Sequence, residues 1–253
     1  MVGIIGYIGR EKAMPILLRG LRSLEQCDYD SVGIATLSDS LKICKGVGKI
    51  GSAIKDKDLT DLEGNIGIAH TRRATHGRIC IANAHPHTDC KKRVAVVHNG
   101  IIENHRELKE RLTGQGHIFT SSTDSEVIAH LIEEKLERER PGNSFEKACQ
   151  DAFGELQGCF ALLAISEEAK RVVAFRKDLP LAMGQADGGF IFTSNVSALL
   201  EWTHNIVYIQ NYNLAVACRK EVVMHGLAQE REIDAARHAM HWERQTLLAN
   251  KNI

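Results

Sequence analysis

The chain opens with the stretch Met1-Val2-Gly3-Ile4-Ile5-Gly6-Tyr7-Ile8-Gly9. Apolar residues fill most of this stretch, and a glycine ends the run. A short apolar run of this kind predicts a buried strand. Val2 has no heteroatom in its side chain, so the second position cannot supply a nucleophile. The stretch therefore predicts a core strand from Val2 to Ile8 that begins without a reactive group.

The apolar residues after this strand recur in patterns that predict helices and strands in groups. Lys12 to Glu25 carries apolar residues at helical spacing. Further helices are expected over 104–112, 125–137 and 145–156, with a short one over 197–202, and further strands over 32–37, 43–47, 66–70, 94–97, 159–165, 172–175, 190–193 and 206–209. Strands in groups, then paired helices, then strands again favour sheets layered with helices over a strictly alternating βαβ array.

The composition excludes several classes of partner. Of the 253 residues, 43% are hydrophobic and 25% are charged, which is typical of a soluble globular protein. Lys+Arg and Asp+Glu both number 32, so the formal net charge is zero. This balance argues against nucleic acid or an anionic membrane as the main partner. No apolar run reaches membrane-spanning length, and the N-terminus lacks the pattern of a signal peptide.

The cysteines predict a reducing compartment. They number seven, are scattered along the chain and form no CxxC pair. This pattern favours reduced thiols in a cytoplasmic protein over a disulfide scaffold or a zinc site. No cofactor is predicted.

Several separate motifs give the chain a family resemblance. They are Leu24-Glu25 with Tyr29-Asp30-Ser31, Gly67-Ile68-Ala69-His70-Thr71-Arg72, Ala74-Thr75-His76-Gly77, Asn83-Ala84-His85-Pro86-His87, Val96-Val97-His98-Asn99-Gly100-Ile101-Ile102-Glu103-Asn104 and Thr123-Asp124-Ser125-Glu126-Val127-Ile128-Ala129-His130-Leu131-Ile132. Together they resemble the glutaminase domain of glucosamine-6-phosphate synthase (glutamine–fructose-6-phosphate aminotransferase), a class II amidotransferase of the N-terminal-nucleophile (Ntn) hydrolase type. The resemblance implies an α+β fold, a four-layer αββα sandwich. It also implies a single glutaminase-like domain over residues 1–253, with the isomerase half of the synthase absent.

The resemblance implies a pocket for the zwitterionic head of glutamine. Arg72 is similar to the guanidinium that takes the α-carboxylate by a fork of parallel donors. Asp124 is similar to the carboxylate that takes the α-ammonium group. Taken singly, each residue has a plainer interpretation: a charged residue after a strand is usually a solvated surface group, and Asp124 precedes a helix as an N-cap residue would.

The resemblance also implies an oxyanion hole. Attack on the side-chain amide of glutamine creates an oxyanion, which needs preorganised donors. Asn99, through its side-chain amide, and Gly100, through its backbone N–H, are similar to the donors of the family. Thr75 and His76 resemble residues that line the same pocket. Without the family context, Asn99-Gly100 is an ordinary tight-turn dipeptide.

Four histidines raise the question of a metal site. They are His70, His85, His87 and His98. The pair His85 and His87 has only one residue between its members, which is shorter than the ligand spacings of the common zinc motifs. Structural or loop roles are therefore favoured over metal binding, and no metal is predicted.

The departures from the family pattern cluster around the missing nucleophile. The family carries cysteine at the position of Val2, where the thiol attacks and the α-amine of the same residue acts as base. Gln26-Cys27-Asp28 replaces a Tyr-Arg-Gly run, Arg73 replaces a tryptophan, and Lys177-Asp178-Leu179 replaces small residues. Cys27 lies beside the site but lacks an attached amine, so an inert thiol is favoured over a displaced nucleophile.

These observations favour a pseudo-glutaminase, which binds glutamine or a similar amino acid without hydrolysing it. Two alternatives stay open. One is an active glutaminase or amidotransferase subunit with an unidentified nucleophile. The other is an interaction protein that pairs with a complete synthase or isomerase subunit, or with a second copy of itself.

Overall fold

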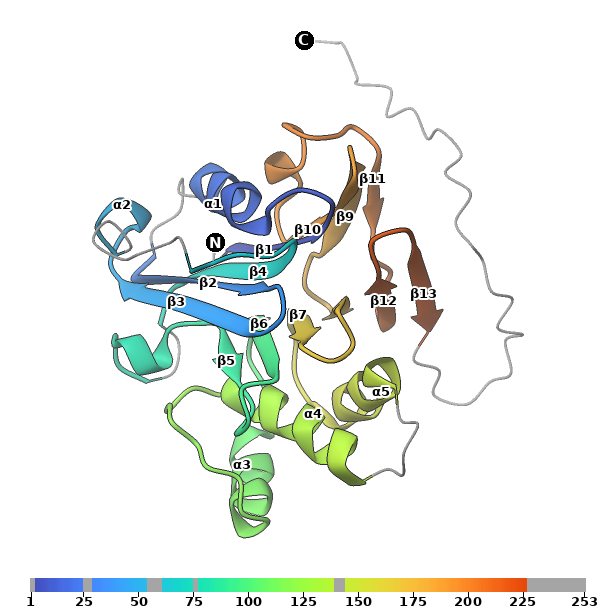
Figure 1. Cartoon of the computed structure of the whole chain (residues 1–253). Helices are drawn as coiled ribbons and strands as arrows, with labels where there is room; N and C mark the ends of the chain where they lie inside the picture. Colours follow the sequence, from blue (N-terminus) through green and yellow to red (C-terminus); the bar gives the residue numbers. More distant parts are fainter. Residues whose placement is uncertain (1–2, 25–28, 54–60, 75–76, 139–143, 227–253) are drawn as a thin grey trace.

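A computed structural model describes residues 3–24, 29–53, 61–74, 77–138 and 144–226. Two sheets lie face to face between two layers of helices (Figure 1). The predicted α+β fold, a four-layer αββα sandwich, is therefore confirmed. Three of the predicted site residues, Val2, Thr75 and His76, lie outside the described residues, as does Cys27.

The first sheet has seven strands in the order β11-β9-β10-β1-β4-β2-β3. Their bounds are β1 (Gly3–Gly9), β2 (Ser31–Leu37), β3 (Leu41–Val47), β4 (Ile66–Arg72), β9 (Ala182–Ala186), β10 (Gly189–Thr193) and β11 (Ile206–Tyr208). The second sheet has six strands in the order β13-β12-β8-β7-β6-β5. Their bounds are β5 (His87–Thr88), β6 (Val94–Gly100), β7 (Phe160–Ser166), β8 (Arg171–Lys177), β12 (Asn213–Ala217) and β13 (Val222–Gly226).

The helices cover the outer faces of the two sheets (Figure 1). The first sheet carries α1 (Ala13–Ser23) and the short α2 (Ile50–Ala53). The second sheet is covered by α4 (Glu126–Arg138) and α5 (Phe145–Glu155), and α3 (His105–Gly114) packs against α4. Two short 3₁₀ turns complete the described elements, at Ile81–Asn83 and Val196–Ala198. None of the helices in the described ranges is long and apolar enough to cross a membrane.

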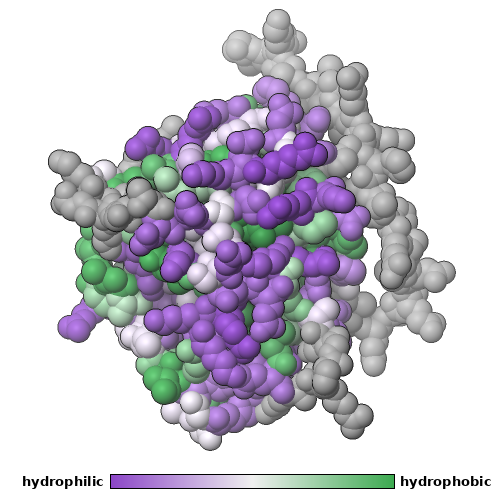
Figure 2. Space-filling view, viewed as in Figure 1, coloured by the Kyte–Doolittle hydropathy of each residue, from purple (hydrophilic) through white to green (hydrophobic). Residues whose placement is uncertain are grey.

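The opening strand shows why this chain forms layers. Side chains of a strand alternate between its two faces. In β1, Ile4 and Ile8 pack into the core between the sheets, whereas Ile5 and Tyr7 pack into the core under α1. All four side chains are at most 1% exposed. Because both faces of β1 are buried, its sequence is apolar throughout instead of alternating with polar residues. On the face of the molecule shown in Figure 2, charged and polar residues predominate, with small apolar patches between them.

The pairing of the strands brings three chain segments to one end of the sandwich. β1 runs antiparallel to β4, so Gly3 pairs with Thr71, and the Gly3 N–H donates to Thr71 Oγ1 at 3.0 Å. On the other side of β4, Arg72 pairs with Ser31 of β2. Strand β6 of the second sheet packs against β4 and ends with Asn99 and Gly100. The start of β1 and the ends of β4 and β6 therefore lie close together.

Most predicted elements are present, with ends that differ by one to three residues. Strands β9, β12 and β13 and the two-residue strand β5 were not predicted. The sequence of β9, Ala-Met-Gly-Gln-Ala, has no β-branched residue, and it becomes a strand by pairing with β10 and β11. The predicted helix over 197–202 is instead a 3₁₀ turn, Val196–Ala198.

Candidate functional site

The centre of the candidate site is a hydrogen bond that crosses between the sheets. His70 Nε2 of β4 lies 2.8 Å from Asn99 Oδ1 of β6. Burial lowers the pKa of His70 to about 3, so the ring is neutral at physiological pH. A neutral imidazole donates its one N–H to a carbonyl oxygen, so His70 Nε2 donates to Asn99 Oδ1. This bond orients the Asn99 amide with its oxygen toward His70. The amide nitrogen, Nδ2, then points to the other side, as a donor of an oxyanion hole would need.

Gly100 follows Asn99 in a conformation that favours glycine. Its φ is 113°, in the left-handed region, and a Cβ atom there would lie 2.1 Å from the Cys159 carbonyl oxygen. Both the dihedral angle and the close approach of the neighbouring strand therefore explain this glycine. The backbone at Asn99-Gly100 is fixed by sheet pairing with β7, so the two residues are not a tight turn between strands.

Arg72 is buried at the end of β4, with 5% of its surface exposed. Its Nη1 lies 3.8 Å from Asp30 Oδ1. Closer donors occupy the same carboxylate: Ser31 Oγ at 2.9 Å and the Ala74 N–H at 2.5 Å. Arg72 is therefore a held, desolvated cation, and the interpretation as a solvated surface group is wrong. Asp30, to which no role was assigned from the sequence, anchors the strand end.

Asp124 is 3% exposed and lies just before α4. Its Oδ2 accepts the Ile102 N–H at 2.8 Å, and Ser125 Oγ lies 3.4 Å from its Oδ1. Within the described residues, none of its hydrogen bonds goes to a backbone N–H of α4, so the N-cap interpretation does not account for it. Asp124 instead ties the start of α4 to the segment that follows Gly100, which places one buried anion near the strand ends that carry Arg72 and Asn99.

His70, His85, His87 and His98 form a buried group of rings, here called the histidine column, in which His70 and His98 stack on His85 and His87 meets His85 edge-on. The ring centroids of His70 and His85 are 4.2 Å apart, and those of His85 and His98 are 6.4 Å apart. Burial lowers the pKa of all four rings, that of His98 to about 4. Their nitrogens face separate partners, such as Ser125 Oγ for His98 at 2.8 Å and Thr123 Oγ1 for His87 at 3.1 Å. The column thus packs as neutral rings that join the two sheets to the start of α4.

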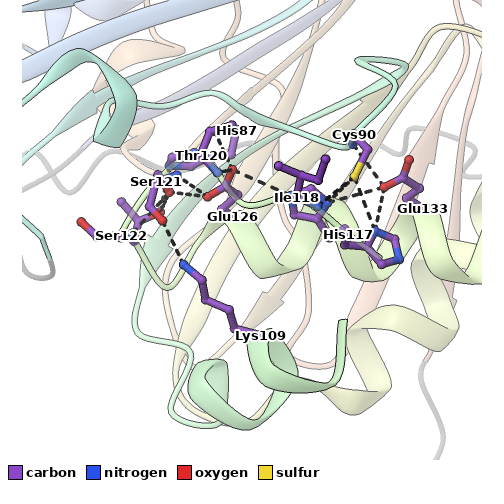
Figure 3. Close-up of polar contacts among 12 residues, drawn as sticks. His87, Cys90, Lys109, His117, Ile118, Thr120, Ser121, Ser122, Glu126 and Glu133 are labelled. Atoms are coloured by element: carbon purple, nitrogen blue, oxygen red, sulfur yellow. Dashed lines mark hydrogen bonds and ion pairs between the residues drawn. The ribbon is translucent and has the colours of Figure 1, made fainter. Parts of the chain in front are cut away.

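Two side chains hold the loop 120–124 in place, and neither was predicted. Asn83 donates to the Arg78 carbonyl at 2.8 Å and accepts the Ser122 N–H at 2.9 Å. Glu126 accepts bonds from the backbone and side chains of Thr120 and Ser121 (Figure 3). Burial opposes the ionisation of Glu126, but the bonds from His130, Ser121 and Thr120 keep the pKa of its carboxyl below its usual range. Beside this loop, a groove of about 680 Å³ opens between the start of α3, Gly77 and residues 122–123.

Comparison with known proteins settles the family. The model of a glutamine amidotransferase domain matches residues 70–201, which carry His70, Arg72, Asn99, Gly100 and Asp124. The chain belongs to this glutamine amidotransferase family. The glutamine–fructose-6-phosphate aminotransferase of Methanococcus maripaludis is 44% identical over 224 residues, 87% of this chain and 37% of that protein. The enzyme of the same name from Pyrococcus horikoshii is 42% identical over 249 residues, 96% of this chain and 40% of that protein. The chain thus spans about two fifths of the length of these relatives.

Solved structures show the same fold in other amidotransferases. The glutamine phosphoribosylpyrophosphate amidotransferase of B. subtilis superposes with a TM-score of 0.77 at 24% identity, over 90% of this chain and 50% of that one. A class II glutamine aminotransferase domain protein from Silicibacter pomeroyi gives a TM-score of 0.58 at 14% identity, over 89% of this chain and 99% of that one. At these identities the likeness concerns the Ntn-type sandwich alone.

Proposed function

We propose that this amidotransferase domain binds glutamine, or an amino acid like it, and does not hydrolyse it. In this proposal Arg72 takes the α-carboxylate, Asp124 takes the α-ammonium group, and Thr75 and His76 line the pocket. The observation that carries the proposal is the His70–Asn99 bond, because it fixes the amide of Asn99 as a donor beside Gly100. Such an arrangement suits the carboxamide oxygen of glutamine as well as an oxyanion.

Val2 is the reason that turnover is excluded from the proposal. The family's route forms a thioester on the second residue, and a hydrocarbon side chain cannot form this bond. An exposed α-amine on Val2 would still be able to orient water. Only the oxyanion hole and substrate binding would then accelerate the reaction. These two contributions give a small part of the rate acceleration that the complete site, with its nucleophile, would have.

Among the described cysteines, Cys90 lies beside two histidines but does not have the geometry of a replacement nucleophile. A relay needs a histidine that offers one ring nitrogen to the thiol and the other to an orienting carboxylate. Cys90 lies near His117 and His130, but the nitrogen of each ring that faces Cys90 also faces Glu133. This geometry does not support the alternative of an active glutaminase with an unidentified nucleophile. Pairing with a synthase subunit stays a prediction, as does a single domain over residues 1–253.

Binding is tested by calorimetry with glutamine and glutamate on protein with its native N-terminus. We expect measurable glutamine binding by the wild type. Asp124→Asn keeps an oxygen that can accept the Ile102 N–H but removes the negative charge, so we expect glutamine affinity to fall at least about 10-fold at nearly unchanged stability. The matched control Asp187→Asn changes an exposed acid and should bind as the wild type does. Failure of the wild type to bind at millimolar glutamine would overturn the proposal.

Loss of turnover is tested by ammonia release. The wild type should release no ammonia above background. Val2→Cys, with Met1 removed, should raise release by at least about 10³-fold, because it restores thiol and amine on one residue. Asn99→Ala in the Val2→Cys background should then lower kcat by about 10²-fold. Steady release by the wild type that survives further purification would contradict the proposal, and its loss in Cys27→Ser or Cys90→Ser would identify the missing nucleophile.

A further inference from the structure

A second group of reactive side chains gathers against α4, beside the turn between β5 and β6. It consists of Cys90, after β5; His117, in the loop before α4; and His130 and Glu133 of α4. These four residues are here called the Cys90 cluster. One ligand atom from each, the Cys90 thiol, the two imidazole Nδ1 atoms and a Glu133 carboxylate oxygen, lies within 4.8 Å of the others (Figure 3). None of these residues takes part in the proposed amino-acid site.

Four of the six distances between the ligand atoms of the Cys90 cluster are close to those of a tetrahedral ligand set. Cys90 Sγ lies 3.8 Å from His117 Nδ1 and 3.5 Å from His130 Nδ1. Glu133 Oε2 lies 2.9 Å from His117 Nδ1 and 3.5 Å from His130 Nδ1. Around a tetrahedral zinc ion with ordinary bond lengths, sulfur and nitrogen ligands are about 3.6 Å apart, and nitrogen and oxygen ligands are about 3.3 Å apart. The four observed distances lie on either side of these values. The side chains would therefore need only small shifts to bind an ion.

All four groups converge on one point, which separates this cluster from a catalytic relay. In a relay, opposite nitrogens of one ring face the thiol and the carboxylate. In the Cys90 cluster the same Nδ1 atom of each ring faces both Cys90 and Glu133. Convergence of a thiol, two imidazoles and a carboxylate is the arrangement by which a protein holds a borderline-soft divalent cation.

The surroundings of the Cys90 cluster orient its ligands. The Ile118 N–H donates to Cys90 Sγ at 3.4 Å, which fixes the position of the sulfur atom. The second nitrogen of His130, Nε2, faces Glu126 Oε1 at 3.8 Å, and metal-bound histidines commonly direct their other nitrogen to a carboxylate. His130 and Glu133 are at most 2% exposed, whereas Cys90 is exposed. Two of the ligands are therefore buried residues of α4. An ion from solvent would reach the site on the side of Cys90.

We propose that Cys90, His117, His130 and Glu133 form a structural zinc site. Four protein ligands close the coordination sphere, so the site has no open position for a substrate or for catalytic water. Thiolate and imidazole ligands select against Mg²⁺ and Ca²⁺, which prefer oxygen. The ion would join three chain segments: the β5–β6 turn, the loop between α3 and α4, and α4 itself.

Cobalt titration followed by absorption spectroscopy is the test. Purified full-length protein, stripped with chelator, should bind one Co²⁺ per chain, with the visible bands of four-coordinate cobalt and a thiolate-to-cobalt charge-transfer band, and Zn²⁺ should displace it. Cys90→Ser should lose the charge-transfer band, and Cys90→Ser and His117→Asn should each weaken Zn²⁺ binding at least about 100-fold. Cys159→Ser and His204→Asn change an exposed thiol and an exposed histidine elsewhere and serve as matched controls.

A second measurement uses the wild type alone and does not depend on the folding of any variant. Zn²⁺ should slow alkylation of Cys90 by iodoacetamide, followed by peptide mass spectrometry, and should leave Cys159 as reactive as before. The proposal is overturned if the protein binds no Co²⁺ or Zn²⁺ at micromolar concentration. It is also overturned if Cys90→Ser binds both ions as the wild type does, or if Zn²⁺ leaves the alkylation of Cys90 unchanged.

Discussion

The histidine column and the Cys90 cluster lie close together in the chain but are built for different chemistry. Both contain buried histidines, and His87 and Cys90 are only three residues apart. In the column three rings stack and His87 packs edge-on against His85, and their nitrogens face separate hydroxyl and amide partners. In the Cys90 cluster the nitrogens face one point, together with a thiol and a carboxylate. The direction of the ring nitrogens, more than the number of histidines, separates a packing role from a ligand role.

The largest expected effect is the response of the column to acid. The pKa of each buried ring in the fold lies below the value of about 6.5 that it has when unfolded. Below pH 6.5 the unfolded chain therefore binds more protons than the folded chain does. The unfolding free energy falls as the pH falls in this range. Between pH 6.5 and pH 5, His70 and His98, whose pKa values in the fold are about 3 and about 4, should each remove on the order of 1 kcal/mol of unfolding free energy, and His85 and His87 should add to this loss.

Urea unfolding at several pH values measures this loss. Carboxyl groups titrate mainly below this pH range. The slope of the unfolding free energy against pH therefore reports on histidines. His204→Asn removes an exposed histidine and should leave the slope unchanged. Stability that stays constant from pH 6.5 to pH 5 would show that the column is not held neutral.

The next largest expected effect is the stabilisation of the fold by Zn²⁺. This stabilisation should require the Cys90 cluster. A ligand that binds the folded state alone, at 100 times its dissociation constant, raises the unfolding free energy by about 2.7 kcal/mol. For a domain of this size that corresponds to roughly 5–10 °C in Tm. Thermal melts of the wild type with and without Zn²⁺ should show this shift, and melts of Cys90→Ser should not. An equal shift in both proteins would place the ion elsewhere.

A smaller loss is expected from Ser125→Ala, which removes one partner from the column. Ser125 Oγ lies 2.8 Å from His98 Nδ1, and Ser125 is 3% exposed. Leaving a buried ring nitrogen without its partner costs about 1–3 kcal/mol. Ser52→Ala, at an exposed hydroxyl bonded to the Lys49 carbonyl, should stay within about 0.5 kcal/mol. Equal stability of the two variants, measured by urea unfolding, would mean that the His98 contact contributes nothing.

The smallest effect is expected from Lys91→Ala, directly beside Cys90. Lys91 pairs with Glu137 on the surface, and both side chains are about half exposed. Exposed pairs of this kind contribute about 0–1 kcal/mol. The variant should therefore unfold within about 0.5 kcal/mol of the wild type and bind Zn²⁺ with unchanged affinity. A marked loss of Zn²⁺ affinity would show that local charge, and not the four ligands, governs the site.

The sequence was sufficient to predict the central strand and the layered fold, because burial on both faces leaves a continuous apolar run. The family motifs likewise pointed to Arg72, Asn99 and Asp124, which lie at the end of β4, near the end of β6 and just before α4. Pattern alone did not reveal that Asp30 holds the end of β4 or that His70 orients Asn99, because these contacts join strands far apart in the chain.

The Cys90 cluster was missed for a related reason. Its local signal is limited to His130 and Glu133, which are three residues apart on one face of α4. Cys90 and His117 reach that face from two separate loops, and no spacing rule connects them. The sequence pattern instead drew attention to the four histidines of the column as metal ligands. Their nitrogens face separate partners in the structure.

The position of β1 in the sheet has a practical consequence for work on this protein. β1 is an interior strand, bonded to β10 on one side and to β4 on the other, and it starts at Gly3 beside Thr71. Any extension attached ahead of this strand would leave the sheet next to Arg72. An affinity handle therefore belongs on the other terminus, since a fusion at the front would crowd the proposed amino-acid site beside Arg72.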